Sequence, residues 1–336
     1  MIYFDFYGFV VELKSSSDEL IDIIRKNFSY FESNNKKSSF KITAIIEEDL
    51  SSLIPKKLTA LKQSINSMTF EQNGLRYNDY YGKAVTIINY KNNYAYAYAK
   101  DINQLHEIVY LLIMSRQGKA CDKRSLHKIH AMAVSSGKKN LILMLPMKGG
   151  KSTMFTKFLS ETDHNLISDD SPCINSNGDL LNFPIRFGIE NKPMYKNLLE
   201  KIESKHVFKL YREQFGEKIL VDFKAFENRI KKPSDKNILI QGFRTSSSGC
   251  RTQSVSKIKM FKFLFINMTI GVGLPMIIEY FIENTVSDHF GNFLIFTKRL
   301  KATLMLLIKS ECYFVYLGND VDLNFTKLNQ LLISGK

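Results

Sequence analysis

A short apolar strand that leads through a glycine loop into a helix is the feature that most limits what this chain can fold into. The continuous apolar run Leu141–Leu145 (LILML) is typical of a strand buried on both faces of a sheet. The loop Pro146–Thr153 (PMKGGKST) follows directly, and Met154–Leu159 can continue as a helix. This order of strand, glycine loop and helix predicts a phosphate-binding loop in an α/β domain.

The residue types in the loop suit a triphosphate. Gly149 and Gly150 let the backbone amides of Lys148–Thr153 approach phosphate oxygens, and the helix start adds partial positive charge. We expect the Lys151 ammonium to reach the β- and γ-phosphates of ATP, and the Ser152 hydroxyl to bind Mg²⁺. The loop is therefore a predicted ATP site.

The loop departs from the G-x-x-x-x-G-K-[ST] pattern at its first position. Leu145 stands where the pattern has a glycine, and Pro146 has no N–H to offer to a phosphate. A Gly-Lys-Ser sequence also occurs by chance, so a glycine-rich turn with a solvated lysine is the alternative. The buried strand before the loop and the helix after it favour phosphate binding.

Two adjacent carboxylates follow the next predicted strand. Asp169 and Asp170 come directly after Asn165–Ser168 (NLIS). Acids at a strand end, one helix after a phosphate-binding loop, lie where Walker-B-type residues hold Mg²⁺ or accept a hydroxyl proton. We expect Asp169 to bind the metal beside Ser152, and both carboxylates are candidates for the catalytic base. The alternative is a plain Asp-Asp-Ser-Pro turn.

A hairpin is predicted after the acids, with Asn177-Gly178 at its turn. Together, the ordered segments resemble the C-terminal catalytic domain of the HPr serine kinase/phosphorylase family and its relatives, which include kinases of lasso-peptide precursors. The segments that carry the resemblance are Ile129–Ala131, Pro146–Thr153, Leu166–Asp170 and Asn182–Ile185.

The resemblance covers about residues 125 to 190. It implies a fold related to phosphoenolpyruvate carboxykinase, ATP with Mg²⁺, transfer of phosphate to a serine hydroxyl, and a homo-oligomer. By position, Lys151 matches the family's loop lysine, Ser152 its magnesium-binding hydroxyl, and Asp169-Asp170 its acidic pair, one member of which is the base. We find no match to the family's signature for the reverse, phosphorolytic reaction, and we do not expect that reaction.

The rest of the sequence predicts a mixed α/β chain with two domains. Residues 123–336 are expected to form the phosphoenolpyruvate-carboxykinase-like P-loop kinase domain. Residues 1–122 are expected to form a small α+β module that either recognises the acceptor or packs on the kinase domain. Its predicted strands and helices are Ile2–Leu13, Leu20–Phe31, Phe40–Ile46, Ala84–Ala99 and Ile102–Ser115.

Composition limits the partners and the location. The 47 Lys and Arg residues against 33 Asp and Glu give a formal charge of +14, which favours acidic partners of several kinds. The basic residues are dispersed and no nucleic-acid-binding motif is present, so we expect no nucleic acid partner.

Four cysteines without zinc or disulfide spacing indicate a cytoplasmic protein. The uncharged run Phe263–Ile278 is too short and too interrupted to span a membrane, so no membrane partner is expected either.

Four further basic residues are weaker candidates. Arg244 and Arg251 lie in Gln241–Arg251, expected to be a flexible Gly/Ser-rich loop that either closes over the γ-phosphate or is simply solvated. Arg186 follows the hairpin, and we expect its side chain to contact one of three groups: a phosphate, an acceptor carboxylate or a surface acid. His130 is expected to pack before the loop strand rather than to act in catalysis.

These features predict an ATP-dependent kinase that phosphorylates a serine of a peptide or protein. Lys151 and the loop amides would fix the phosphates, and Asp169 or Asp170 would deprotonate the acceptor. Two alternatives remain open at this stage. One is a kinase of a small molecule, such as free serine or a sugar. The other is a nucleotide-binding regulatory protein without catalysis, in which Leu145-Pro146 mark a degraded loop.

Overall fold

The computed structural model describes residues 1–189, 195–212, 216–274 and 286–334, and the chain is mixed α/β, as predicted. Contacts divide it into two compact units. The first is Met1–Ala120 with Phe208–Glu217, and the second is Cys121–Val207 with Lys218–Lys336. The segment 208–217 thus groups with the N-terminal residues, whereas the sequence placed it in the second domain. One contact responsible is that of the His106 and Phe208 rings, whose centroids are 6.3 Å apart.

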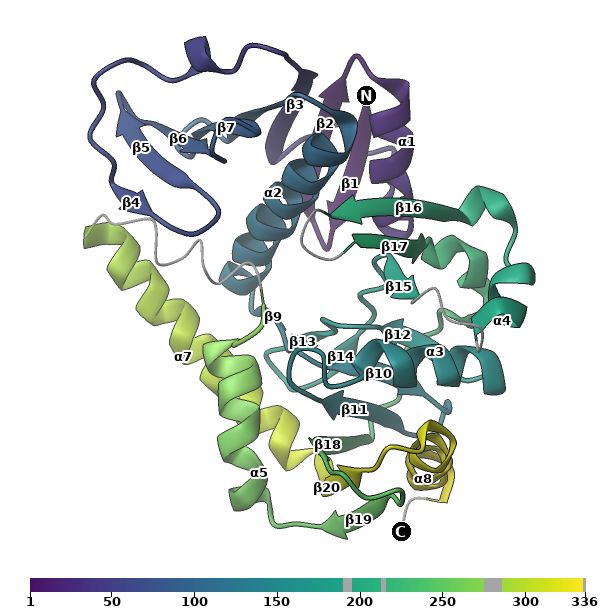
Figure 1. The fold of residues 1–336 in the computed structure, drawn as a ribbon. Helices are drawn as coiled ribbons and strands as arrows, with labels where there is room; N and C mark the ends of the chain where they lie inside the picture. Colours follow the sequence, from purple (N-terminus) through teal and green to yellow (C-terminus); the bar gives the residue numbers. More distant parts are fainter. Residues whose placement is uncertain (190–194, 213–215, 275–285, 335–336) are drawn as a thin grey trace. The chain divides into compact units, whose positions relative to one another are not determined.

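The first unit is built on an eight-stranded sheet with the order β1-β2-β3-β8-β7-β6-β5-β4 (Figure 1). β3 pairs in parallel with β2 and β8, and the other neighbours are antiparallel. Its strands are β1 Ile2–Phe6, β2 Phe9–Ser15, β3 Phe40–Ile46, β4 Lys62–Gln63, β5 Met68–Gln72, β6 Leu75–Asp79, β7 Ala84–Asn89 and β8 Tyr94–Ala99. Its helices are α1 Asp18–Asn27 and α2 Ile102–Lys123.

The second unit is built on a six-stranded mixed sheet with the order β12-β10-β11-β18-β20-β19. Its strands are β10 Met132–Ser135, β11 Asn140–Met144, β12 Asn165–Ser168, β18 Asn237–Arg244, β19 Arg251–Ser254 and β20 Ser310–Leu317. Its long helices are α3 Lys151–Glu161, α5 Lys257–Leu264, α7 Val286–Ile308 and α8 Val321–Ser334. The predicted strand, loop and helix around the glycines therefore form β11, the loop and α3.

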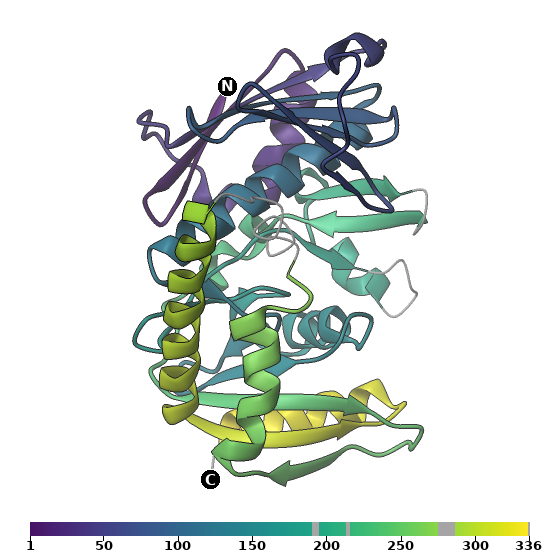
Figure 2. The same cartoon turned by 90° about the vertical axis from the view of Figure 1, so that its left-hand side faces the viewer.

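Helices cover both faces of this sheet, because alternate residues of its strands point to opposite sides. Leu141 and Leu143 of β11 belong to a core cluster with residues of α3 and α8. Ile142 and Met144 belong to a second cluster with residues of α5 and α7. Figure 2 shows α5 beside α7, and their contact agrees with this second core. A strand buried on both faces explains the continuous apolar run in the sequence.

Strand directions bring several loops to one edge of the sheet. β11 runs parallel to β18, and β18 runs parallel to β20. β10 is antiparallel to both β11 and β12, so β12 runs in the same direction as β11. The carboxyl ends of these four strands and the amino end of β10 consequently lie at the same edge. This edge is called the carboxyl edge below.

Several smaller elements remain, of which Phe208–Arg212 of β16 and Gly216–Glu217 of β17 belong to the first unit and the rest to the second. The predicted hairpin forms, since β13 pairs antiparallel with β14, and β13 also pairs with β9. β15 pairs antiparallel with residues 219–221 of β17. These elements are β9 Leu126–Lys128, β13 Cys173–Asn175, β14 Leu180–Leu181, β15 Phe187–Ile189, α4 Lys196–Glu200, β16 Val207–Arg212 and β17 Gly216–Val221.

The uncharged run of the sequence begins inside α5 and continues through a π-helical turn, Phe265–Ile270. Met268 is buried there in the core of the second unit, as expected for a soluble-core segment. Residues 275–278 of the run lie outside the described residues. Among the helices that the structure describes, none combines the length and the apolar character that crossing a membrane requires.

Candidate phosphate-binding site at the carboxyl edge

The glycine loop lies at the carboxyl edge and has a tightly turned backbone. Lys148 has φ +59°, and Gly150, at the N-cap of α3, has φ +100°. The Gly149 N–H donates to the Pro146 carbonyl oxygen at 2.9 Å. A Cβ on Gly149 would lie only 2.8 Å from that same oxygen. The loop therefore requires glycine at position 149 for space, and at position 150 for its left-handed conformation.

The N–H groups at the start of α3 point toward the loop, as N–H groups of a helix point toward its N-terminus. The first of them have no acceptor within the helix and can therefore bind another group. Lys151 and Ser152 are the first two residues of α3, and Thr153 is half-buried in the same turn. The side chain of Lys148 is exposed on the loop. Helix start and turned loop together provide the partial positive charge that anions bind.

Leu145 occupies the position at which the phosphate-loop pattern has glycine. Its side chain is buried, with 1% of its surface exposed, and it joins the core cluster between the sheet and α3. Gly242 of β18 makes room for it, since a Cβ there would lie 2.5 Å from the Leu145 Cδ2 atom. The Leu145 side chain thus points into the core and not toward the space enclosed by the glycine loop.

The Lys151 ammonium is held inside the loop. Its side chain is 7% exposed, and Nζ donates to the carbonyl oxygens of Leu145 at 2.8 Å and Pro146 at 3.4 Å. Nζ also lies 3.6 Å from Asp170 Oδ1. Burial lowers the pKa of Lys151, while the charges of Asp170 and Asp169 oppose that change. A cation is thereby kept within reach of both carboxylates.

Asp169 is buried at the end of β12 and pairs with the helix start. The Ser152 hydroxyl donates to its Oδ2 atom at 3.0 Å. Its Oδ1 atom is buried and has no hydrogen-bond partner among the described residues. Burial, followed by the negative charge of Asp170, raises the pKa of Asp169 to about 7, although Lys218, Ser152 and Lys151 act in the opposite direction.

Asp170 has the opposite electrostatic character. Its side chain is 49% exposed, and its Oδ1 atom lies 3.3 Å from His130 Nε2. Burial would raise the pKa of Asp170, but the hydrogen bond and charge of His130 and the charge of Lys151 outweigh it, so the pKa is lowered. The two neighbouring carboxyl groups are thus pushed apart in pKa, which is common where a site separates two roles.

His130 was expected only to pack before the strand. It is buried there, and it also contacts Asp170. Its backbone N–H donates to the Asn267 carbonyl oxygen at 3.1 Å. Gly273, with φ +90°, lies against the ring, since a Cβ at that position would be 2.2 Å from Nδ1. The imidazole is therefore held on both sides and fixes the orientation of Asp170.

Arg244 ends β18 beside the loop. Its Nη2 atom lies 3.6 Å from the position that a Cβ on Gly150 would take, and its Nη1 atom donates to the Gly318 carbonyl oxygen at 3.1 Å. The expectation of a flexible loop over 241–251 is wrong in part, because residues 241–244 pair with β20 as part of β18, and Gln241 also pairs with Met144 of β11. Arg244 is thus anchored on the sheet, and the connecting loop is 245–250.

The other two arginine candidates lie outside the glycine loop in the chain, Arg251 in β19 and Arg186 just before β15. Arg251 begins β19 and stacks on Tyr316, with its guanidinium carbon 4.8 Å from the ring centroid. Arg186 is buried, with 9% of its surface exposed. Arg251 therefore has a stacking partner that does not depend on a phosphate.

Lys218 was not among the site residues predicted from the sequence. Its charge lowers the pKa of Asp169, and it lies in β17, far along the chain. Its side chain crosses Gly188, where a Cβ would lie 1.9 Å from the Lys218 Cε atom. Gly188 pairs with Leu220, two residues beyond Lys218, so this approach could be recognised only after the pairing of β15 and β17 was known.

The residues of the site fit a cation that takes part of its ligands from phosphate and water. Across the part of the chain that the structure describes, no three His, Cys, Asp or Glu side chains gather as a metal cluster. Magnesium commonly takes one or two protein ligands and completes its shell with phosphate oxygens and water. Ser152 and Asp169, with the partnerless Oδ1 atom of Asp169, fit that mode.

No protein-family model matches the chain, and no curated protein has a matching sequence.

Proposed function

We propose that this protein is an ATP-dependent kinase that transfers the γ-phosphate to a serine hydroxyl of a peptide or protein. The observation that carries the proposal is the meeting of three groups at the carboxyl edge. These groups are the Lys151 ammonium inside a glycine loop, the Ser152–Asp169 pair, and Asp170 oriented by His130. The proposal includes a kinase domain related to phosphoenolpyruvate carboxykinase and a location in the cytoplasm.

The loop would bind the nucleotide through its phosphates. The amides of Lys148–Thr153 and the Lys151 ammonium would contact the β- and γ-phosphates, and the anchored Arg244 guanidinium lies beside Gly150 to meet the same charge. On phosphate binding, Lys151 would exchange its bonds to the Leu145 and Pro146 carbonyl oxygens for bonds to phosphate oxygens. This exchange keeps the ammonium hydrogen-bonded in both states.

Ser152 and Asp169 are the residues that would hold Mg²⁺. A bound cation favours an ionised carboxylate, so it would remove the cost that burial imposes on the Asp169 charge. When bound, the ion neutralises charge on the phosphate oxygens. Asp169 is therefore assigned to the metal together with Ser152, which leaves Asp170 as the carboxylate available to act as the base.

Asp170 is the better candidate for the base. It is half exposed, its pKa is lowered, and His130 orients it. In the proposed step its carboxylate accepts the proton of the acceptor serine as the serine oxygen bonds to the γ-phosphorus and the bond to the ADP oxygen breaks. Lys151 and Arg244 stabilise the charge that develops on the transferred group.

The test is transfer of labelled γ-phosphate from ATP in the presence of Mg²⁺. The purified chain is incubated separately with peptide and metabolite pools, and products are identified by mass spectrometry. We expect phosphoserine in peptides, and loss of transfer in Lys151→Ala and Asp170→Asn, while the exposed control Asp163→Asn retains it. Products found only among metabolites, or ATP binding without any product, would contradict the proposal.

A further inference from the structure

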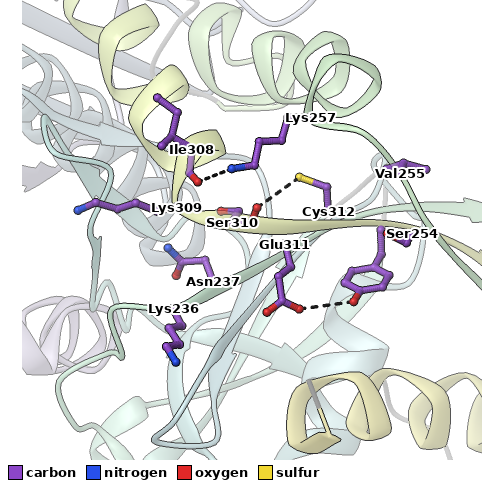
Figure 3. Close-up of a pocket in the computed structure, with 11 residues that line it drawn as sticks. Lys236, Asn237, Ser254, Val255, Lys257, Ile308, Lys309, Ser310, Glu311 and Cys312 are labelled. Carbon is purple, nitrogen blue, oxygen red and sulfur yellow. Dashed lines mark hydrogen bonds between the residues drawn. The ribbon is translucent and has the colours of Figure 1, made fainter. Parts of the chain in front are cut away.

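A second polar cavity lies at the opposite edge of the same sheet. It has a volume of about 500 Å³ and is lined by the amino ends of β18 and β20, the last residues of β19 and the first residue of α5 (Figure 3). β11, β18 and β20 are parallel, and the glycine loop follows the carboxyl end of β11. The cavity lies at the amino ends of β18 and β20, so the length of the strands separates it from the glycine loop. Its volume is in the range of small-ligand sites.

Three ammonium groups line the cavity. Lys257 donates to the Ile308 carbonyl oxygen at 2.5 Å, and Lys309 donates to Asp179 Oδ1 at 2.5 Å. An ammonium has three N–H donors, so each of these lysines keeps further donors after one bond. Lys236 is exposed at the cavity wall, and no bond of its side chain is recorded. The three cations thus retain most of their hydrogen-bonding capacity.

Negative charge in the lining is limited to one group that is already paired. Glu311 is the lining carboxylate, and its Oε1 atom accepts from Lys139 Nζ at 2.6 Å. Tyr313 donates to its Oε2 atom at 3.4 Å. Two hydroxyl residues, Ser254 and Ser310, add short polar side chains to the wall. Lys309 is paired with Asp179 and Glu311 with Lys139, so the net positive charge of the lining comes from Lys236 and Lys257.

We propose that this cavity binds a compact phosphate-bearing anion, at a site distinct from the nucleotide loop. Lys236, Lys257 and Lys309 would contact the anion, since ammonium groups bind phosphate as point charges. The start of α5 in the same wall favours negative charge. This proposal does not depend on kinase activity. Two sources share this chemistry, inorganic phosphates and nucleoside monophosphates, and the Tyr313 ring in the wall gives the second a surface for its base.

The test uses the full chain carrying Lys151→Ala, so that the nucleotide loop does not compete for anions. Binding of inorganic pyrophosphate and of AMP is measured separately by calorimetry at fixed ionic strength. We expect one of them to bind. The added changes Lys236→Gln and Lys309→Gln should each weaken binding about tenfold, as expected for a charge-assisted hydrogen bond.

Matched variants separate this site from general attraction to a basic protein. Lys301→Gln removes the same charge from an exposed position of α7 and should leave affinity unchanged. Ser254→Glu places a carboxylate in the exposed wall of the cavity and should abolish binding without removing a lysine. Equal losses in Lys236→Gln and Lys301→Gln, or no binding of either anion at millimolar concentration, would overturn the proposal.

Discussion

Replacing Asp169 by Asn should stabilise the protein while removing its activity. The carboxyl group is 7% exposed and its pKa is raised to about 7 from an ordinary value of 3.8, chiefly by burial and secondly by Asp170. An Asn side chain has nearly the same shape, carries no charge, and can still accept the Ser152 hydrogen bond. The substitution therefore removes the cost of a buried charge and keeps the packing.

The sign and size of the effect follow from the two pKa values. The folded state holds the Asp169 proton more tightly than the unfolded state, so the wild-type protein loses stability as pH rises from 3.8 to about 7. That interval corresponds to about 4 kcal/mol at full ionisation. We expect Asp169→Asn to be more stable than wild type by up to about 4 kcal/mol near pH 8, and by roughly 1–2 kcal/mol near pH 5.

Urea unfolding at both pH values, without nucleotide or divalent cation, measures this difference. The exposed Asp163→Asn serves as a control and should change stability little at either pH. Phosphoryl transfer by Asp169→Asn, assayed separately near pH 8 with ATP and Mg²⁺, should be lost although the variant is most stable at that pH. A variant that is less stable than wild type near pH 8, or a stability difference that does not change with pH, would refute the reasoning.

Three further substitutions have defined outcomes. Lys128 is fully buried, and burial lowers its pKa to about 8. Lys128→Met should therefore raise the free energy of unfolding, measured with urea, by up to about 3 kcal/mol near neutral pH. This gain in stability should vanish above about pH 10, where the lysine is neutral in the folded and the unfolded state. Arg299 binds both Asp122 carboxylate oxygens at 2.9 and 2.8 Å in the core, and Arg299→Met should cost about 3–5 kcal/mol in the same assay. Gly149→Ala should weaken ATP binding in calorimetry, because its Cβ would collide with the Pro146 oxygen.

Local sequence signals predicted much of the fold. β3 and β12 have the bounds that their apolar patterns indicated, and the Asn177-Gly178 hairpin forms as its turn residues predicted. These elements depend on neighbouring residues, so short-range patterns suffice. By contrast, no strand was predicted from the sequence at the positions where β16 and β17 form.

The missing parts depend on pairing between distant segments. β18 is a central strand because β11 and β20 flank it. The Gly- and Ser-rich residues that follow it led to the prediction of a loop instead. The contact of His130 with Asp170 follows from the antiparallel placement of β10 between β11 and β12. Lys218 comes near Asp169 only because β17 pairs with β15. The site residues were predicted from sequence motifs. The distances between them could not be predicted, because they depend on the order of the strands in the sheet.

Calorimetric titration of ATP in the presence of Mg²⁺ tests the central claim most directly. We predict that the wild-type chain binds ATP, that binding weakens when Mg²⁺ is withheld, and that Lys151→Ala loses it. Lys157→Ala, a change on the same helix at a side chain paired with Glu161, should bind as wild type does. Equal binding by Lys151→Ala and wild type, or no binding by wild type, would contradict the account.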